Sequence, residues 1–177
     1  LDKYKIRDKY YHIVVDGTGL ATSRKRYNEK CLVKNKTDKN GNEYQEYSTY
    51  VLEAKLVVGE MVFSIGSEFV ENTKENETKQ DCEIKAFKRL AEKIKSEYPK
   101  LKILISGDAL YASKPVMDIC KENGWKYVIR FKEGSIPSLY KEFETVVKKA
   151  NESKKANYEY VTGLDYEEEK INVIKYT

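Results

Sequence analysis

Two aspartates, each placed directly after a short apolar run, are the residues of this chain best suited to chemistry. Asp16 closes the stretch "YYHIVVD", and Asp108 closes "LKILISGD". An unbroken apolar run of this length is typical of a strand buried on both faces. We therefore expect each carboxylate at the exit of a buried strand. An acid in such a position favours a turn cap, a metal ion or catalysis.

The two carboxylates would meet if their strands lie side by side and parallel. Adjacent carboxylates repel and raise each other's pKa unless a divalent cation lies between them. Mg²⁺ (or Mn²⁺) fits such a pair because it takes hard oxygen ligands and keeps substrate phosphates in its shell. The pair predicts metal-assisted phosphoryl transfer, with Asp16 and Asp108 as catalytic residues and metal ligands. Taken singly, each could instead form or cap a local turn.

The elements that position these acids can be read from hydrophobic periodicity and turn residues. Residues 49–58 and 61–69 predict two strands joined tightly at Gly59-Glu60, an antiparallel hairpin that follows the first strand as a meander. The polar, Lys-rich stretch 21–48 between them is expected to be mostly loop, with a turn at Asn40-Gly41.

The second half of the chain alternates helices and strands. The predicted elements are a helix from Asp81 to Pro99, a strand at 101–108, a helix between Ser113 and Gly124, a strand at 125–131, a helix at 135–151 and a hairpin at 157–177. Strand–helix–strand units make parallel neighbours, whereas the opening meander is antiparallel. The fold class is therefore α/β, with a mixed sheet and the order strand, strand, strand, helix, strand, helix, strand, helix.

Composition narrows the class of protein. With 35% charged residues and no long apolar run, the 177 residues contain no membrane-spanning helix, and we expect no membrane partner. The odd count of three cysteines argues against a disulfide framework and a zinc site, which favours the cytoplasm. The net charge of +4 is a mild basic bias, compatible with nucleic acid. Because the chain begins with Leu1, we expect it to be a piece of a longer protein.

The stretches "VVDGTGL", "DCEIKAFKRL" and "ISGDALYAS", in this order, resemble the catalytic core of a DDE-class insertion-sequence transposase with a ribonuclease H-like fold. The resemblance spans roughly 11–150, so we assign 1–150 to a partial catalytic core and 151–177 to the start of a β-rich insertion. It implies DNA cleavage and strand transfer with two metal ions, on transposon-end duplex DNA, by a homo-oligomer. In that family the first two acids match Asp16 and Asp108.

The third acid of the family's triad is a Glu in a Tyr-x-x-Arg-x-x-x-Glu pattern on a later helix. The similar spacing at Tyr127 and Arg130 places Gly134 where Glu is required, in a segment that reads as strand. We therefore expect the triad to be incomplete here and the missing Glu to follow Thr177. A chain with two of the three acids is expected to bind metal weakly and not to catalyse strand transfer.

Further residues are candidates for the site. Glu83 falls on the apolar stripe of its predicted helix, so it is either an additional metal ligand or a first-turn acid that complements the helix dipole. His12 is too far along its strand from Asp16 for a catalytic dyad and is interpreted as structural. Candidate DNA-binding residues, whose cations would contact phosphates, are Arg24, Lys25, Arg26, Lys114 and Arg130.

Two other readings stay open from the sequence. Another ribonuclease H-like nuclease or resolvase would use the same two acids. A non-catalytic DNA-binding remnant would keep the fold without dependence on Mg²⁺.

Overall fold

The computed structural model describes residues 1–71, 82–150 and 157–176. They form two compact units, Leu1–Arg130 and Phe131–Thr177, each of which is described by itself. The predicted helix start at Asp81 and the polar connection before it lie outside the described residues. No helix in the described part of the chain is both long and apolar enough to cross a membrane.

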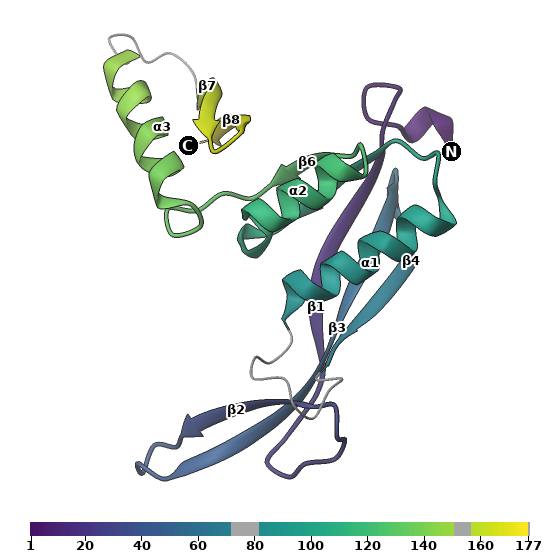
Figure 1. Cartoon of the computed structure of the whole chain (residues 1–177), viewed down its shortest axis with the longest axis vertical. Helices are drawn as coiled ribbons and strands as arrows, with labels where there is room; N and C mark the ends of the chain where they lie inside the picture. Colours follow the sequence, from purple (N-terminus) through teal and green to yellow (C-terminus); the bar gives the residue numbers. More distant parts are fainter. Residues whose placement is uncertain (72–81, 151–156, 177) are drawn as a thin grey trace. The chain divides into compact units, whose positions relative to one another are not determined.

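A mixed sheet forms the first unit (Figure 1). Its strands are β1 (Tyr11–Ser23), β2 (Leu32–Thr37), β3 (Glu43–Val58), β4 (Met61–Val70), β5 (Ile103–Gly107) and β6 (Lys126–Ile129). They follow the order β2-β3-β1-β5-β6, and β4 also pairs with β3. The pairs around β3 are antiparallel, whereas β5 is parallel to both β1 and β6. The sheet is mixed as predicted, an architecture compatible with a ribonuclease H-like fold.

Two helices supply the apolar partners of this sheet. Helix α1 (Glu83–Glu97) carries Phe87, Leu90 and Ile94 on one buried stripe, and α2 (Lys114–Glu122) follows β5 after a short 3-10 helix, η2 (Ala109–Tyr111). The core cluster joins these helices to alternate residues of β1 and β5, among them Ile13 and Ile105, which are fully buried. Apolar residues that recur every 3.6 positions in the helices thus pack against apolar residues that recur at every second position of the strands.

Close approach of α1 to the sheet depends on a glycine of β4. A Cβ atom at Gly66 would lie 3.2 Å from Cδ1 of Leu90, so a larger residue here would require the Leu90 side chain to shift by a few tenths of an ångström. At the edge of the same contact, Glu68 of β4 accepts hydrogen bonds from Arg89 and Lys93 of α1. Burial raises and both cations lower the pKa of Glu68, and the net shift is downward.

One predicted segment is wrong. The stretch 21–48, expected to be mostly loop, contains the end of β1, all of β2 and the start of β3, so four strands precede α1 instead of three. The strands were not predicted because their side chains are mostly polar and show no apolar alternation. They form an antiparallel two-stranded ribbon held by backbone pairing, with Leu32 opposite Ser48 and Thr37 opposite Glu43. The predicted turn is present, because Asp38 accepts hydrogen bonds from the backbone of Asn40 and Asn42.

The remaining predicted elements are confirmed to within a few residues. The hairpin between β3 and β4 turns at Gly59 and Glu60, and Gly124 ends α2 with a φ of 70°. Ser113 is the N-cap residue of α2, although its hydroxyl makes no capping hydrogen bond.

The second unit consists of α3 (Pro137–Ala150) and the antiparallel hairpin of β7 (Tyr158–Tyr166) and β8 (Glu169–Tyr176). Helix α3 packs on β7, and its buried Leu139 and Phe143 share this unit with the buried Leu164 and Ile171. The hairpin predicted for the tail is therefore confirmed. The expected boundary between residues 150 and 151 falls inside this unit, directly after α3, and the division by function stays a prediction.

We predict that Leu90→Ala lowers the free energy of unfolding by about 3 kcal/mol, because the side chain is fully buried between α1 and the sheet and its removal leaves a cavity. Urea unfolding followed by circular dichroism measures the change. The matched control, Lys88→Ala on the exposed side of the same helix, should stay within about 0.5 kcal/mol of the parent chain. Equal effects of the two substitutions would contradict the packing described here.

Candidate functional site

The parallel pairing of β1 and β5 aligns the two predicted acids. Val14 of β1 lies opposite Ser106 of β5, the last pair recorded between these strands. Asp16 and Asp108 each follow two residues later, so they occupy equivalent positions along neighbouring strands, whose axes are about 4.8 Å apart. The register thus places the two acids level with each other, although Asp16 lies within β1 and not at the end of its strand.

The two acids differ in local structure. Asp16 does not stand at the exit of its strand, as predicted from the apolar run, because β1 continues to Ser23. This correction follows from β3, which pairs with β1 far beyond Asp16 and holds the polar continuation in strand conformation. Asp108 does directly follow β5, where it is the N-cap residue of η2.

One oxygen of each carboxylate is engaged by the backbone. Oδ1 of Asp16 accepts a hydrogen bond from the backbone N–H of Gly17 at 3.0 Å, and Oδ1 of Asp108 accepts one from Leu110 at 2.9 Å. These are the local turn and cap interactions that the sequence left open as alternatives. They orient both side chains and leave the second oxygen of each without a hydrogen bond among the described residues.

No described cation neutralises the pair. Both side chains are exposed, and neither forms an ion pair with a lysine or arginine in the described part of the chain. Two neighbouring carboxylates without a protein counter-charge attract a divalent cation. Their free oxygens are hard ligands of the kind that Mg²⁺ takes, and Mg²⁺ is commonly held by one or two carboxylates. The donor set therefore fits this metal.

Glu83, the third acid considered, is held by a buried tyrosine. The Tyr111 hydroxyl donates a hydrogen bond to Oε2 of Glu83 at 3.0 Å, and the Tyr111 ring packs edge-on against Phe87. The carboxylate lies over Gly17, where a Cβ atom would approach Oε2 to 2.6 Å. Since side chains alternate along a strand, Glu83 faces the side of β1 opposite to that of Asp16.

The pKa of Tyr111 reflects its burial and the negative charge of the acids around it. Burial, then the charge and the hydrogen bond of Glu83, and then the charges of Asp16 and Asp108 raise the pKa of Tyr111 far above its usual range. The charges of all three carboxylates therefore reach this hydroxyl, and Glu83 alone is hydrogen-bonded to it. Among the described residues, however, no three His, Cys, Asp or Glu side chains gather closely enough to form a metal site by themselves.

A further acid, Glu53, was missed because only the register of β1 and β3 reveals it. It lies directly opposite Asp16 across the antiparallel pair. Its carboxylate accepts a hydrogen bond from the Ser64 side chain and forms an ion pair with Lys55 at 3.0 Å. Both contacts lower the pKa of Glu53. The local cation offsets the repulsion expected between like charges on facing strands.

His12 is structural, as the sequence indicates. Its Nε2 atom shares a hydrogen bond of 2.9 Å with the Ser106 hydroxyl, which ties β1 to β5 next to the carboxylate pair. Burial lowers the pKa of His12. The neutral imidazole is thus favoured in the folded chain.

The predicted DNA-binding residues fall in two places. Arg24, Lys25 and Arg26 follow β1 at the base of the ribbon, where Arg26 donates to the carbonyls of residues 28 and 29. Lys114 begins α2 and pairs with Asp118, while the backbone N–H of Arg130 donates to the carbonyl of Gly107. The last two residues thus lie on elements next to Asp108, and the first three do not join them in one cluster.

Comparison with protein families places most of the second half of the sequence in a known family. The family model described as "Transposase DDE domain group 1" matches residues 66–172, more than half of the chain. The matched range includes Glu83 and Asp108 and runs into β8, whereas Asp16 and the ribbon precede it. No curated protein matches the chain.

We predict that Tyr111→Phe and Glu83→Gln are coupled, because the first removes the hydrogen bond between the two side chains and the second removes the charge that strengthens it. Urea unfolding of both single variants and the double variant should give a coupling free energy of about 1–2 kcal/mol. As control, Tyr111→Phe is paired with Glu122→Gln at the end of α2, which should give strict additivity. Additivity of the Tyr111 and Glu83 substitutions would mean that the bond contributes nothing.

The single histidine makes stability between pH 7 and 5 a clean measurement. The pKa of His12 lies below its ordinary value of 6.5 in the folded chain, so the unfolded chain takes up this proton first. Stability contributed by the neutral imidazole is therefore present above about pH 6.5 and declines as the pH falls.

His12→Gln should flatten this decline in the free energy of unfolding, measured by urea titration at several pH values. A variant with the parent chain's slope would show that His12 does not control stability in this window.

Proposed function

The chain belongs to the DDE transposase family, and on that premise we propose that it supplies two of the catalytic acids for metal-dependent DNA cleavage and strand transfer during transposition, without catalysing strand transfer by itself. The observation that carries the proposal is the pairing of β1 with β5, which aligns Asp16 and Asp108, neither of which has a lysine or arginine partner among the described residues. We further propose that the first unit is the ribonuclease H-like core of this activity.

In this proposal Asp16 and Asp108 would hold Mg²⁺ or Mn²⁺. A bound divalent cation supplies activation of the attacking oxygen and stabilisation of the leaving oxygen in a phosphodiester exchange. The chain's own contribution is to fix the two carboxylates. Backbone N–H groups orient one oxygen of each, and the parallel register of β1 and β5 holds the two residues level.

The surrounding groups have supporting roles in the proposal. Tyr111 holds the Glu83 carboxylate beside Gly17, so a third carboxylate lies on the helix side of β1. Glu83 itself stays a proposed ligand of lower rank than the aspartates, because its acceptor oxygen is already engaged by the tyrosine. Lys114 and Arg130, on elements next to Asp108, are proposed to contact phosphates.

The proposed partner is the duplex DNA of transposon ends, bound by a homo-oligomer in the cytoplasm. Three features support this environment: the family match, the basic balance of +4, and the three cysteines, which are all free thiols.

The proposal is tested by Mn²⁺ binding to this chain, measured by electron paramagnetic resonance as loss of the free-ion signal. Asp16→Asn and Asp108→Asn should each weaken binding by about tenfold or more, because the charge of the ligands sets cation affinity. The control is Asp8→Asn, which removes the same charge just before the start of β1, away from the two aspartates. Asparagine suits its left-handed backbone, whose φ is 55°.

Two results would count against the proposal. Binding that resists both aspartate substitutions would place the metal elsewhere. Binding that falls equally in the Asp8→Asn variant would reflect general surface charge instead of a site.

A further inference from the structure

We propose that the ribbon of residues 24–48, called the β-arm from here on, binds duplex DNA through its phosphates. This inference rests on the proposed function and adds a second DNA contact to the one at the carboxylates. The β-arm comprises the connection after β1, all of β2, the turn at 38–42 and the first part of β3. It precedes the range matched by the family model.

The β-arm is a regular two-stranded element that extends away from α1 and α2 of the same unit (Figure 1). Its base is anchored by the buried Leu32, which lies opposite the buried Ser48. Beyond this pair the four residues of β2 that follow Val33 are all exposed. The tip is fixed by Asp38, which caps the turn, and by Gly41 with a φ of 84°. The shape is therefore set before any partner binds.

The charge of the β-arm favours a polyanion. It carries seven lysines or arginines against four acids. The acid Glu46 is already paired with Lys36 at 2.6 Å, and Asp38 is satisfied by backbone N–H groups, which lower its pKa. Within the described residues, no ion pair is formed by the exposed cations Arg24, Lys25, Lys34 and Lys39.

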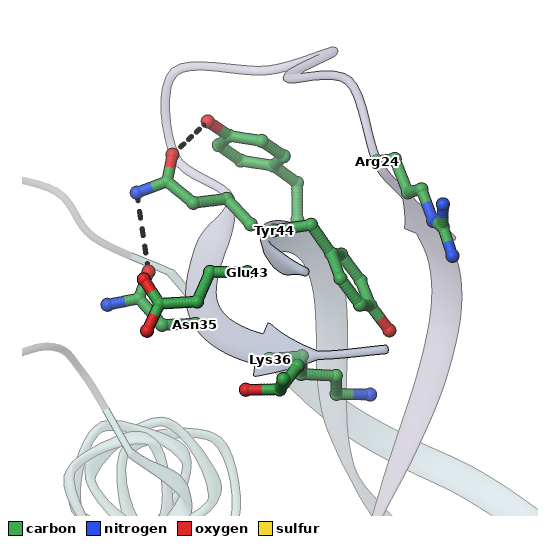
Figure 2. A pocket seen from close by; sticks show the side chains of 8 residues that line it. Arg24, Asn35, Lys36, Glu43 and Tyr44 are labelled. Carbon is green, nitrogen blue, oxygen red and sulfur yellow. Dashed lines mark hydrogen bonds between the residues drawn. The ribbon is translucent and has the colours of Figure 1, made fainter. Parts of the chain in front are cut away.

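Aromatic contacts hold two of these cations in place. The guanidinium carbon of Arg24 lies 4.4 Å from the centroid of the Tyr44 ring, and Nζ of Lys34 lies 5.9 Å from that of Tyr50. Figure 2 shows Arg24 and Tyr44 beside an open hollow of about 560 Å³ that is also lined by Lys36 and Glu43. A cation oriented in this way loses little freedom when it binds a phosphate.

Polar groups without charge share the same hollow. Tyr47 donates a hydrogen bond to Gln45 at 2.7 Å, and the Gln45 amide donates to Asn35 at 3.4 Å (Figure 2). Amide and hydroxyl side chains of this kind supply many of the contacts that proteins make to the sugar and phosphate groups of DNA. The chemistry favours nucleic acid over an apolar protein partner.

The dimensions also suit a duplex. A two-stranded ribbon fits the major groove, which is about 12 Å wide. Seven residues separate Asp16 from Ser23 at the base of the β-arm, a run of about 23 Å along β1. One turn of the duplex spans about 34 Å, so DNA at the carboxylates reaches the β-arm within one turn.

The test is fluorescence anisotropy of a labelled duplex of about two helical turns, titrated with the chain at several salt concentrations without added metal. The triple variant Arg24→Ala, Lys34→Ala, Lys39→Ala should bind about tenfold or more weakly, with a salt slope smaller by about 2–3. The matched control removes three exposed lysines near the other end of β1, Lys9→Ala, Lys100→Ala and Lys102→Ala, and should bind like the parent. Circular dichroism confirms folding of both.

The outcomes separate the two proposals. Parent, variant and control that bind DNA equally would overturn the β-arm inference and leave the proposed function standing. A parent chain that binds no duplex even at low salt would overturn both. A β-arm variant that binds DNA normally but changes the sedimentation of the free protein would identify the β-arm as a contact between copies instead.

Discussion

The parallel pairing of β1 with β5 is the constraint on which the candidate site depends. The two strands are remote in sequence, and their register sets Asp16 level with Asp108. That pairing is stabilised from one side by the buried residues packed under α1 and α2, and from the other by the hydrogen bond of His12 with Ser106. A shift by one residue would turn one carboxylate to the opposite face of the sheet, because side chains alternate along a strand.

Several acids of the first unit have a side-chain partner of a kind that Asp16 and Asp108 lack among the described residues. Glu53 has Lys55, Glu68 has Arg89 and Lys93, and Glu83 is held by Tyr111. Asp16 and Asp108 receive only backbone hydrogen bonds in the described residues, although they are close enough to raise the pKa of the same tyrosine. Uncompensated carboxylates destabilise a fold, and a site that binds cations is a physical reason to keep them. The β-arm shows the opposite imbalance, an excess of cations on exposed strands.

Local patterns predicted much of this structure. The spacing of Phe87, Leu90 and Ile94 located α1, and the two apolar runs located the cores of β1 and β5. Features that depend on which strands pair, and in which register, could not be predicted from the sequence. The ribbon was missed because its strands lack an apolar face and depend on backbone pairing, the extent of β1 was set by β3, and Glu53 became a neighbour of Asp16 only through register. Tyr111 was visible in "DALY", but its bond to Glu83 depends on how η2 and α1 pack.

The most direct measurement of the central claim is a crystal structure of the chain grown with Mn²⁺, with the ion located from its anomalous scattering. The account predicts a peak in contact with carboxylate oxygens of both Asp16 and Asp108. Side chains that diverge into separate turns, or an ion bound away from both, would contradict it.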